Sequence, residues 1–249
     1  MLDVLTNRQT IRKYSNQPIS NDLLEKLLEA TCRAPNTGNM QTYSIIITHD
    51  ETKKKELSPC HFNQKMITEA PVVLTFCADF NRVNKWCEQR NAKPGYDNFL
   101  SFTSAMIDAT IAAQHFCVAA ESEGLGTCYL GTTTYTADKI IDILQLPKFV
   151  VPITTITIGY PDETPATKDD RLPLNGIVHY ETYKDYSADD INQIYAYKEN
   201  LESSKNFIEI NKKETLAQIY TDIRYTKAAN EQFSEVLIAV LKKQGFWKE

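Results

Sequence analysis

Two spacings of apolar residues in the first third of the chain predict one helix and two strands. In residues 20–33, leucines recur at i, i+1, i+4 and i+5, which places them on one face of an amphipathic helix. Ser20 suits the N-cap of that helix. Residues 43–50 and 71–79 are β-rich, and the second run is almost wholly apolar. Strands buried on both faces have this composition, so both runs are predicted to be central strands.

The longest predicted helix in the first half covers residues 99–123 and ends at Gly124, which suits a C′ position. It is apolar nearly all round, but four polar residues interrupt it: Asp108, Gln114, His115 and Glu121. Such residues are costly in lipid, so the pattern favours a buried core helix over a membrane span. No membrane partner is expected.

The segments after Gly124 continue the alternation of strands and helices. Residues 125–134 are predicted to form a strand or strand-like loop, 136–146 a helix capped by Thr136, and 151–161 a further strand. This order is typical of an α+β or α/β fold.

The chain changes character after residue 186. Residues 187–249 show little β signal and few helix breakers, so they are predicted to form a helical C-terminal extension. Its apolar residues need a surface to cover, on the main domain or on a partner subunit. The predicted organisation is therefore a domain at 1–186 and an extension at 187–249.

Composition and charge indicate which kinds of partner and which compartment the chain favours. The 249 residues are 42% hydrophobic and 24% charged, as in ordinary globular proteins. The formal net charge is −5 and the longest basic run is 53–55, which argues against nucleic acid. The N-terminus lacks the pattern of a signal peptide, which favours the cytoplasm. Six cysteines without a C-x-x-C pair are predicted to be reduced thiols, with no metal site.

The sequence offers few side-chain catalysts. It has four histidines and no G-x-S-x-G, H-E-x-x-H or P-loop pattern, so any chemistry would belong to a bound cofactor. Arg8, Thr10 and Arg12 stand two apart and could face one ligand in an extended conformation. Two guanidinium groups and a hydroxyl suit a phosphate monoester, although a basic surface segment explains them equally well.

Five motifs occur in a characteristic order between residues 7 and 183. They are R-x-T-x-R-x-Y from Arg8, P-x-x-x-N-x-Q from Pro35, HFNQKMITEAPVVLTFCADFNR at 61–82, GLGTCYLG at 124–131 and RLPLNGIVHYETY at 171–183. Together they resemble the nitroreductase family, and within it the larger, NADPH-preferring nitroreductase and flavin reductase subgroup.

The resemblance implies an FMN site with its residues spread along the chain. Phosphate would be held near Arg8, Gln9, Thr10 and Arg12, and by the late basic pair Lys168 and Arg171. Asn36, Thr37, Gly38 and Asn39 would line the flavin, Gln64 would bond the isoalloxazine edge, and Tyr129 and Leu130 would pack beside the ring. Gly131 would offer its backbone N–H to flavin N5, which is the reactive atom, so no side chain is assigned as a catalyst.

Physical chemistry supports three of these assignments independently of the family. Four cations would offset a buried phosphate dianion that one or two would leave undercompensated. The Gln64 amide can both donate and accept, which fits a flavin pyrimidine edge. A glycine at 131 lets the backbone come close to the ring.

The sequence also departs from the family pattern. Gln9 stands where many members have a second Arg, and Thr132 where the subgroup often repeats Gly. Lys168 and Arg171 are three apart rather than two. These departures leave the preference between NADPH and NADH open, and Lys198, Lys205 and Arg224 are unranked candidates for the 2′-phosphate of NADPH.

The predicted protein is an α+β homodimer with a nitroreductase-like mixed sheet flanked by helices, and with tail helices wrapping the partner. It would use NADPH or NADH to reduce nitroaromatic, quinone or flavin acceptors through FMN in a ping-pong sequence. The alternatives are a dedicated flavin reductase, a reductive dehalogenase, and a non-catalytic FMN-binding module that would not oxidise NAD(P)H.

Overall fold

The computed structural model describes residues 2–163 and 168–247. The chain divides into two compact units. Unit 1 comprises Met1–Ala166 with Phe233–Glu249, and unit 2 comprises Thr167–Gln232. The predicted domain boundary after residue 186 stays a prediction.

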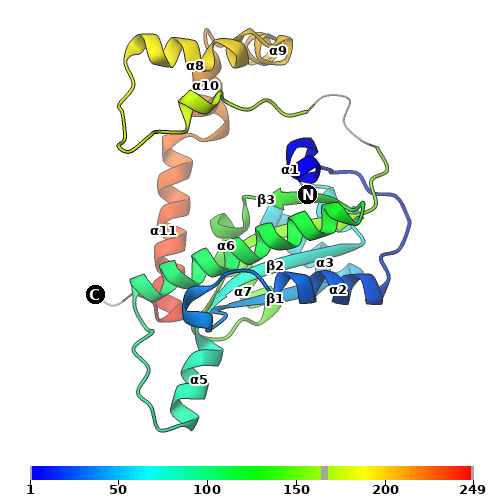
Figure 1. Cartoon of the computed structure of the whole chain (residues 1–249), viewed down its shortest axis with the longest axis vertical. Helices are drawn as coiled ribbons and strands as arrows, with labels where there is room; N and C mark the ends of the chain where they lie inside the picture. Colours follow the sequence, from blue (N-terminus) through cyan, green and yellow to red (C-terminus); the bar gives the residue numbers. More distant parts are fainter. Residues whose placement is uncertain (1, 164–167, 248–249) are drawn as a thin grey trace. The chain divides into compact units, whose positions relative to one another are not determined.

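Unit 1 is built on a four-stranded sheet with the order β1-β2-β4-β3 (Figure 1). The strands are β1 (Tyr43–Thr48), β2 (Val72–Asp79), β3 (Gly126–Leu130) and β4 (Val150–Gly159). All three pairings between these strands are antiparallel. A parallel contact occurs at the isolated bridge between Thr10 and Thr127.

The two strands predicted to be central differ in position. Every residue of β2 is buried, as its apolar run predicts. The prediction for β1 is wrong, because β1 lies at an edge of the sheet. Its isoleucines, including Ile45 and Ile47, are only half-buried. An apolar run of this length does not distinguish an edge strand with one covered face from a central strand.

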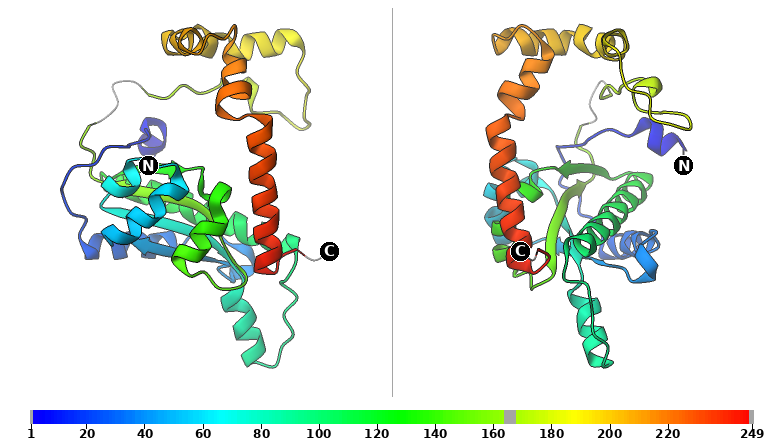
Figure 2. Two further views of the ribbon diagram at one scale, coloured as in Figure 1. Left: turned by 180° about the vertical axis from the view of Figure 1, so that it is seen from behind. Right: turned by 90° about the vertical axis from the view of Figure 1, so that its left-hand side faces the viewer.

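Helices cover both faces of the sheet (Figure 2). The helices α6 (Phe99–Ser122) and α2 (Asn21–Thr31) pack on one face, where Phe116 and Leu27 meet Phe76 of β2 in one core. The helices α3 (Glu51–Leu57) and α7 (Ala137–Leu144) pack on the other face, where Leu57 and Ile140 meet Val73. Side chains alternate across a strand, so neighbouring residues of β2 enter different cores.

The predicted helices at 20–33 and 99–123 are confirmed. The Ser20 hydroxyl accepts a hydrogen bond from Leu23 N at 3.2 Å and caps α2. Gly124, after α6, has φ +80°, which suits its predicted C′ role. Thr136 precedes α7 but does not cap it, because its hydroxyl donates to Cys60 O instead.

Shorter helices complete unit 1: α1 (Leu2–Asn7), α4 (Met66–Glu69) and α5 (Asn81–Gln89). Helix α11 (Lys227–Gln244) ends in this unit, where Val240 and Leu241 pack with Phe246 on a core that includes Phe102. Unit 2 contains α8 (Ala188–Asn200), α9 (Glu202–Ile210), α10 (Leu216–Ile219) and a π-helical turn, η5 (Tyr220–Arg224). The tail is thus helical, as predicted. None of the described helices is long and apolar enough to cross a membrane.

Candidate functional site

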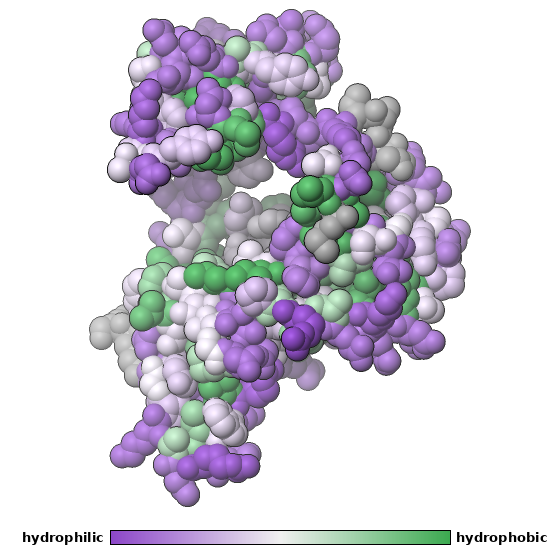
Figure 3. Space-filling view, viewed as in Figure 1, coloured by the Kyte–Doolittle hydropathy of each residue, from purple (hydrophilic) through white to green (hydrophobic). Residues whose placement is uncertain are grey.

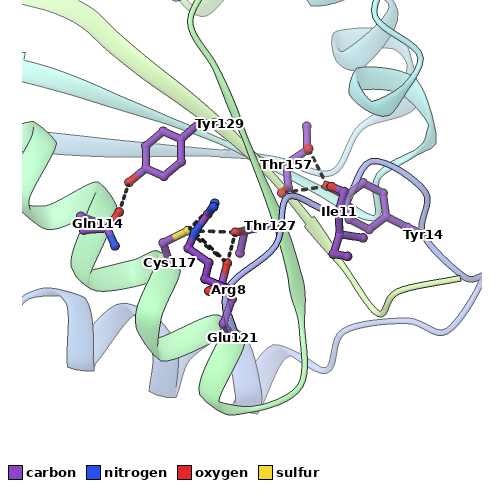
Figure 4. A network of polar contacts seen from close by, with 9 residues as sticks. All are labelled: Arg8, Ile11, Tyr14, Gln114, Cys117, Glu121, Thr127, Tyr129 and Thr157. Carbon is purple, nitrogen blue, oxygen red and sulfur yellow. Dashed lines mark hydrogen bonds and ion pairs between the residues drawn. The ribbon is translucent and has the colours of Figure 1, made fainter. Parts of the chain in front are cut away.

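The N-terminal segment lies along β3. Ile11 N donates to Thr127 O at 3.0 Å, and Thr10 forms the parallel bridge to Thr127. The Tyr14 hydroxyl holds the end of the segment, 2.9 Å from Ile11 O and 2.7 Å from Thr157 Oγ1 (Figure 4). Burial raises the pKa of Tyr14, so its hydroxyl stays neutral and able to donate. Thr10 is therefore paired with β3, and Arg8, Gln9 and Arg12 flank it along the chain. Whether Arg8, Thr10 and Arg12 face one ligand stays a prediction.

Two glycines make this approach possible. A Cβ at Gly126 would lie 2.5 Å from Ile11 Cβ, and one at Gly159 would lie 2.8 Å from the Tyr14 ring. Both distances are far shorter than van der Waals contact. Gly126 in the GLGTCYLG motif is thus required by the protein's own packing.

Arg8 joins a network of polar groups between the N-terminal segment, α6 and β3 (Figure 4). Its Nε lies 3.3 Å from Glu121 Oε1, and its Nη2 lies 4.0 Å from the Cys117 sulfur. The Thr127 hydroxyl donates to the same Glu121 oxygen at 2.6 Å. Glu121 was noticed in the sequence only as a polar interruption of the apolar helix. Its charged partner, Arg8, is distant in the chain, so local patterns could not identify this ion pair.

Arg12, on the N-terminal segment, lies near Cys128 of β3. Burial raises the pKa of the Cys128 thiol, and the charges of Arg12 and Arg8 oppose that shift, which places both guanidinium groups around it. The Gln9 Oε1 atom is buried without a hydrogen-bond partner among the described residues. Two cations, one carboxylate at Glu121 and an unsatisfied amide therefore meet here. Their net formal charge of one is too small to neutralise a phosphate dianion without further cations.

The loop at residues 36–42 is fixed from α6. Asp108 is 1% exposed, and its Oδ1 accepts bonds from Thr37 N at 2.8 Å and Thr37 Oγ1 at 2.9 Å. Its Oδ2 accepts from Thr42 Oγ1 at 2.6 Å. Asn36 Oδ1 accepts from Gln41 N at 3.0 Å. Asp108 is a further residue whose role the sequence did not reveal.

Left-handed backbone recurs in the same loop. Gly38, Asn39 and Gln41 have φ values of 56°, 55° and 48°. Only glycine adopts such values without cost, so the hydrogen bonds that Asp108 and Asn36 accept must hold the other two. The loop at 36–39 is thus held in one conformation, as a ligand-lining segment requires.

Packing does not require a glycine at position 131, and the Gln64 side chain is only half-buried. Gly131 is exposed, and a Cβ placed on it would meet no atom within 4 Å. The Gln64 backbone closes a turn with Ile67 N at 3.0 Å, but no hydrogen bond of its amide is found among the described residues. Both residues are therefore available to a ligand.

The two residues before Gly131 face opposite ways. Tyr129 packs against the core that contains Phe116, and its hydroxyl donates to Gln114 Oε1 at 3.3 Å (Figure 4). Leu130 is 2% exposed and belongs to the core with Leu57. Its side chain is used by the interior, so the predicted packing of Leu130 beside a flavin ring stays a prediction.

His61 is a further residue that the sequence reasoning missed. It is fully buried at the end of the short helix η2 (Ser58–His61), and its Nδ1 lies 2.8 Å from Thr132 Oγ1. Thr132 directly follows Gly131. The contact spans 71 positions in sequence, so no local pattern could predict it.

The late basic residues lie in unit 2. Lys168 and Arg171 are exposed, and Arg171 Nη1 donates to Asp170 O at 2.8 Å. Lys198 pairs with Asp170 at 3.3 Å, and with Arg224 it lines one cavity of about 260 Å³.

Lys205, the third candidate for binding the 2′-phosphate of NADPH, does not line that cavity. Lys205 pairs with Glu202 at 3.6 Å, near the start of α9. Among the residues that the structure describes, no group of three or more His, Cys, Asp or Glu side chains is placed to hold a metal.

Comparison with known proteins identifies the family. The model of the nitroreductase family matches residues 5–160. The chain belongs to the nitroreductase family. It is 34% identical over 251 residues to the FMN reductase [NAD(P)H] of Bacillus subtilis, covering 97% of this chain and 96% of that protein. It is 30% identical to the oxygen-insensitive NADPH nitroreductase of Salmonella typhimurium, covering 74% of each.

Solved structures agree with this membership. A crystal structure from Bacteroides fragilis superposes with a TM-score of 0.97 at 57% identity, covering 99% of this chain and 100% of that one. The NfrA1 nitroreductase of Bacillus subtilis gives 0.86 at 28% identity, covering 98% of each chain. The resemblance seen in the motifs and the predicted α+β class are both confirmed.

Proposed function

We propose that this nitroreductase-family chain is an FMN-dependent NAD(P)H oxidoreductase that reduces nitroaromatic, quinone or flavin acceptors. The observation that carries the proposal is Gly131, a glycine that neither packing nor backbone conformation requires. A ligand that must approach the backbone closely explains it. The printed names of the relatives support the cofactor and the donor, since they include FMN reductases and NADPH nitroreductases.

The residues around the N-terminal segment fit the phosphate of FMN. Arg8 and Arg12 supply two guanidinium groups, and Thr10 supplies a hydroxyl. Gln9 Oε1 is buried without a partner among the described residues; as an acceptor it would bind a donor group of the ligand and not its phosphate. Glu121 opposes the positive charge, so Arg8 and Arg12 alone undercompensate a phosphate dianion, and the binding of phosphate by Lys168 and Arg171 stays a prediction from the family resemblance.

The residues further along fit the ring of FMN. The Gln64 amide has no hydrogen bond among the described residues, so it can meet a mixed donor and acceptor edge. The Gly131 backbone is unobstructed. The loop at 36–39, clamped by Asp108, borders the ring. When bound, FMN supplies hydride acceptance from NAD(P)H and two-electron transfer to the acceptor in a ping-pong sequence. The chain orients the ring, and no side chain is assigned as the proton donor.

The chain acts as a homodimer in this proposal. Large apolar side chains on α6 are exposed, namely Phe99 at 52%, Leu100 at 75% and Ile107 at 49%. Figure 3 shows hydrophobic surface gathered over α6. In unit 2, Leu174 and Tyr180 are 78% and 86% exposed. Exposed apolar side chains on each unit mark interaction surfaces, and a second copy of the chain is the occupant we assign.

The decisive test is Gly131→Val. Its side chain would enter empty space, so the free energy of unfolding of the apoprotein should change by less than about 0.5 kcal/mol. FMN affinity should fall at least tenfold, or by about 1.4 kcal/mol, measured by quenching of flavin fluorescence. Gly95→Val is the matched control, because a Cβ there also meets no atom within 4 Å, outside the proposed site. Unchanged FMN affinity in Gly131→Val would remove Gly131 from the site.

An anaerobic spectrum tests the reaction itself. The purified protein should absorb near roughly 450 nm and lose that band after one equivalent of NADPH or NADH. A yellow protein that does not bleach would instead support the non-catalytic FMN-binding module. An acceptor screen then separates nitroaromatic and quinone reduction from dedicated flavin reduction or reductive dehalogenation.

A further inference from the structure

Two short turns of unit 1 are tied together by side-chain hydrogen bonds. One turn is η2, and the other is η3 (Thr133–Thr136). His61 Nδ1 lies 2.8 Å from Thr132 Oγ1, and Thr136 Oγ1 donates to Cys60 O at 2.8 Å. These bonds join the segment that leads into Gln64 to the segment that follows Gly131. Both residues belong to the proposed flavin-ring site, so the distance between them depends on this junction.

The His61 ring is neutral, and only one of its two nitrogens has a hydrogen-bond partner among the described residues. It is fully buried, and burial lowers the pKa of His61 to about 4. A neutral imidazole carries one N–H and one lone pair. Nδ1 is bonded to Thr132, whereas Nε2 has no partner among the described residues. An apolar side chain would fill the same space without an unsatisfied nitrogen, so packing alone does not explain a histidine here.

The backbone after His61 is held in a costly conformation. Phe62 and Asn63 both have φ 55°, in the left-handed region that non-glycine residues rarely adopt. Asn63 N donates to Ser58 O at 2.9 Å, and Gln64 N to His61 O at 3.1 Å. Strained backbone of this kind persists where surrounding contacts specify it, and it concentrates at functional sites.

We propose that His61 is a positioning residue for the flavin ring, which holds Thr132, and with it the Gly131 backbone, against the turn that carries Gln64. The proposal rests on the proposed FMN site and assigns its ring-binding geometry to one hydrogen bond. The second tie, from Thr136 to Cys60, keeps the turns adjacent when the first is removed. His61 variants should therefore fold and should bind flavin less tightly.

The experiment uses two matched pairs of full-length variants. An asparagine amide can occupy the place of imidazole Nδ1, whereas a glutamine amide reaches the place of Nε2. His61→Asn should keep the bond to Thr132, and His61→Gln should lose it. Thr132→Ser keeps the hydroxyl, and Thr132→Val removes it with little change in volume.

Binding of FMN and of riboflavin to each apoprotein is measured by fluorescence quenching. His61→Gln and Thr132→Val should weaken both ligands equally, by about tenfold, because the effect is on the ring and not on the phosphate. His61→Asn and Thr132→Ser should stay within about twofold of wild type. The double variant of His61→Gln and Thr132→Val should lose no more than either single variant, since both remove one bond.

The outcomes separate this proposal from the proposed function. If wild type binds FMN and all four single variants bind it equally well, the role of His61 is disproved while the FMN site stands. Equal losses in His61→Asn and His61→Gln would likewise overturn it, because the bond to Thr132 would not be the cause. If wild type takes up no FMN, both proposals fall.

Discussion

The two ends of β3 differ in what surrounds a glycine. At the start of the strand, Gly126 is covered by Ile11, and the N-terminal segment closes the surface. Just past its end, Gly131 faces empty space. The first glycine is required by the protein's own packing, whereas the second is not. A residue that the fold itself does not need is the better indicator of a ligand.

The strongest contrast between the two ends should appear in stability. Gly126→Ala places a Cβ 2.5 Å from Ile11 Cβ, an atom too close to the backbone to rotate away. The free energy of unfolding should fall by about 3 kcal/mol, measured by urea denaturation. Gly131→Ala is the control and should change it by less than about 0.5 kcal/mol. Equal losses of unfolding free energy in Gly126→Ala and Gly131→Ala would show that packing does not distinguish the two glycines.

A fall in pH should lower the free energy of unfolding through His61, which lies near the Gly131 end of β3. Its folded-state pKa of about 4 lies below the ordinary 6.5, so the unfolded chain binds a proton that the folded chain does not. The stabilisation is complete above pH 6.5 and is lost as the pH falls to about 4, by about 3 kcal/mol in total. His61→Asn should lack this contribution. If the free energies of unfolding of wild type and His61→Asn fell equally between pH 6.5 and 4, this prediction would be contradicted.

On the N-terminal segment, which covers the Gly126 end of β3, Arg12→Ala should weaken FMN binding by about 2 kcal/mol, or roughly 30-fold. A charge-assisted bond to phosphate is lost in this variant. Riboflavin affinity and the unfolding transition should not change, since Arg12 is exposed and riboflavin has no phosphate. Lys13→Ala, which removes an exposed neighbouring cation paired with Glu163, is the control. Full FMN affinity in Arg12→Ala would exclude it from the phosphate site.

The smallest expected effect has the opposite sign. Glu121→Gln removes the carboxylate that pairs with Arg8 at 3.3 Å, which frees that guanidinium for phosphate. FMN should bind more tightly by about 1 kcal/mol, or roughly fivefold. Glu123→Gln, which disturbs only an exposed pair with Lys26, should not change FMN affinity. Weaker binding in Glu121→Gln would show that Glu121 supports the site.

Local patterns predicted the elements but not their long-range partners. The helix at 99–123, the buried strand at 71–79 and the helical tail follow from periodicity and composition, and the structure confirms them. Periodicity could not place β1 at the sheet edge, because that position depends on which strands pair. Thr136 has the right residue type for a cap, but its hydroxyl found an acceptor at Cys60 instead.

The candidate site shows the same limit. Its motif residues were recognisable from their order along the chain. Asp108, Glu121 and His61 were not, because each acts on a segment far away in sequence. The signal available for the two acids was a charge inside an apolar helix, where an unpaired carboxylate would be costly. That cost predicts a partner without saying which.

The clamp on the loop at 36–42 also imposes an order of events during synthesis. Asp108 is added to the growing chain 66 residues after Thr42 and 71 residues after Thr37. Until α6 has been made, the left-handed residues Gly38, Asn39 and Gln41 have no carboxylate to hold them. On a growing chain, this part of the proposed cofactor site therefore takes its final shape only after more than two-fifths of the protein has been translated.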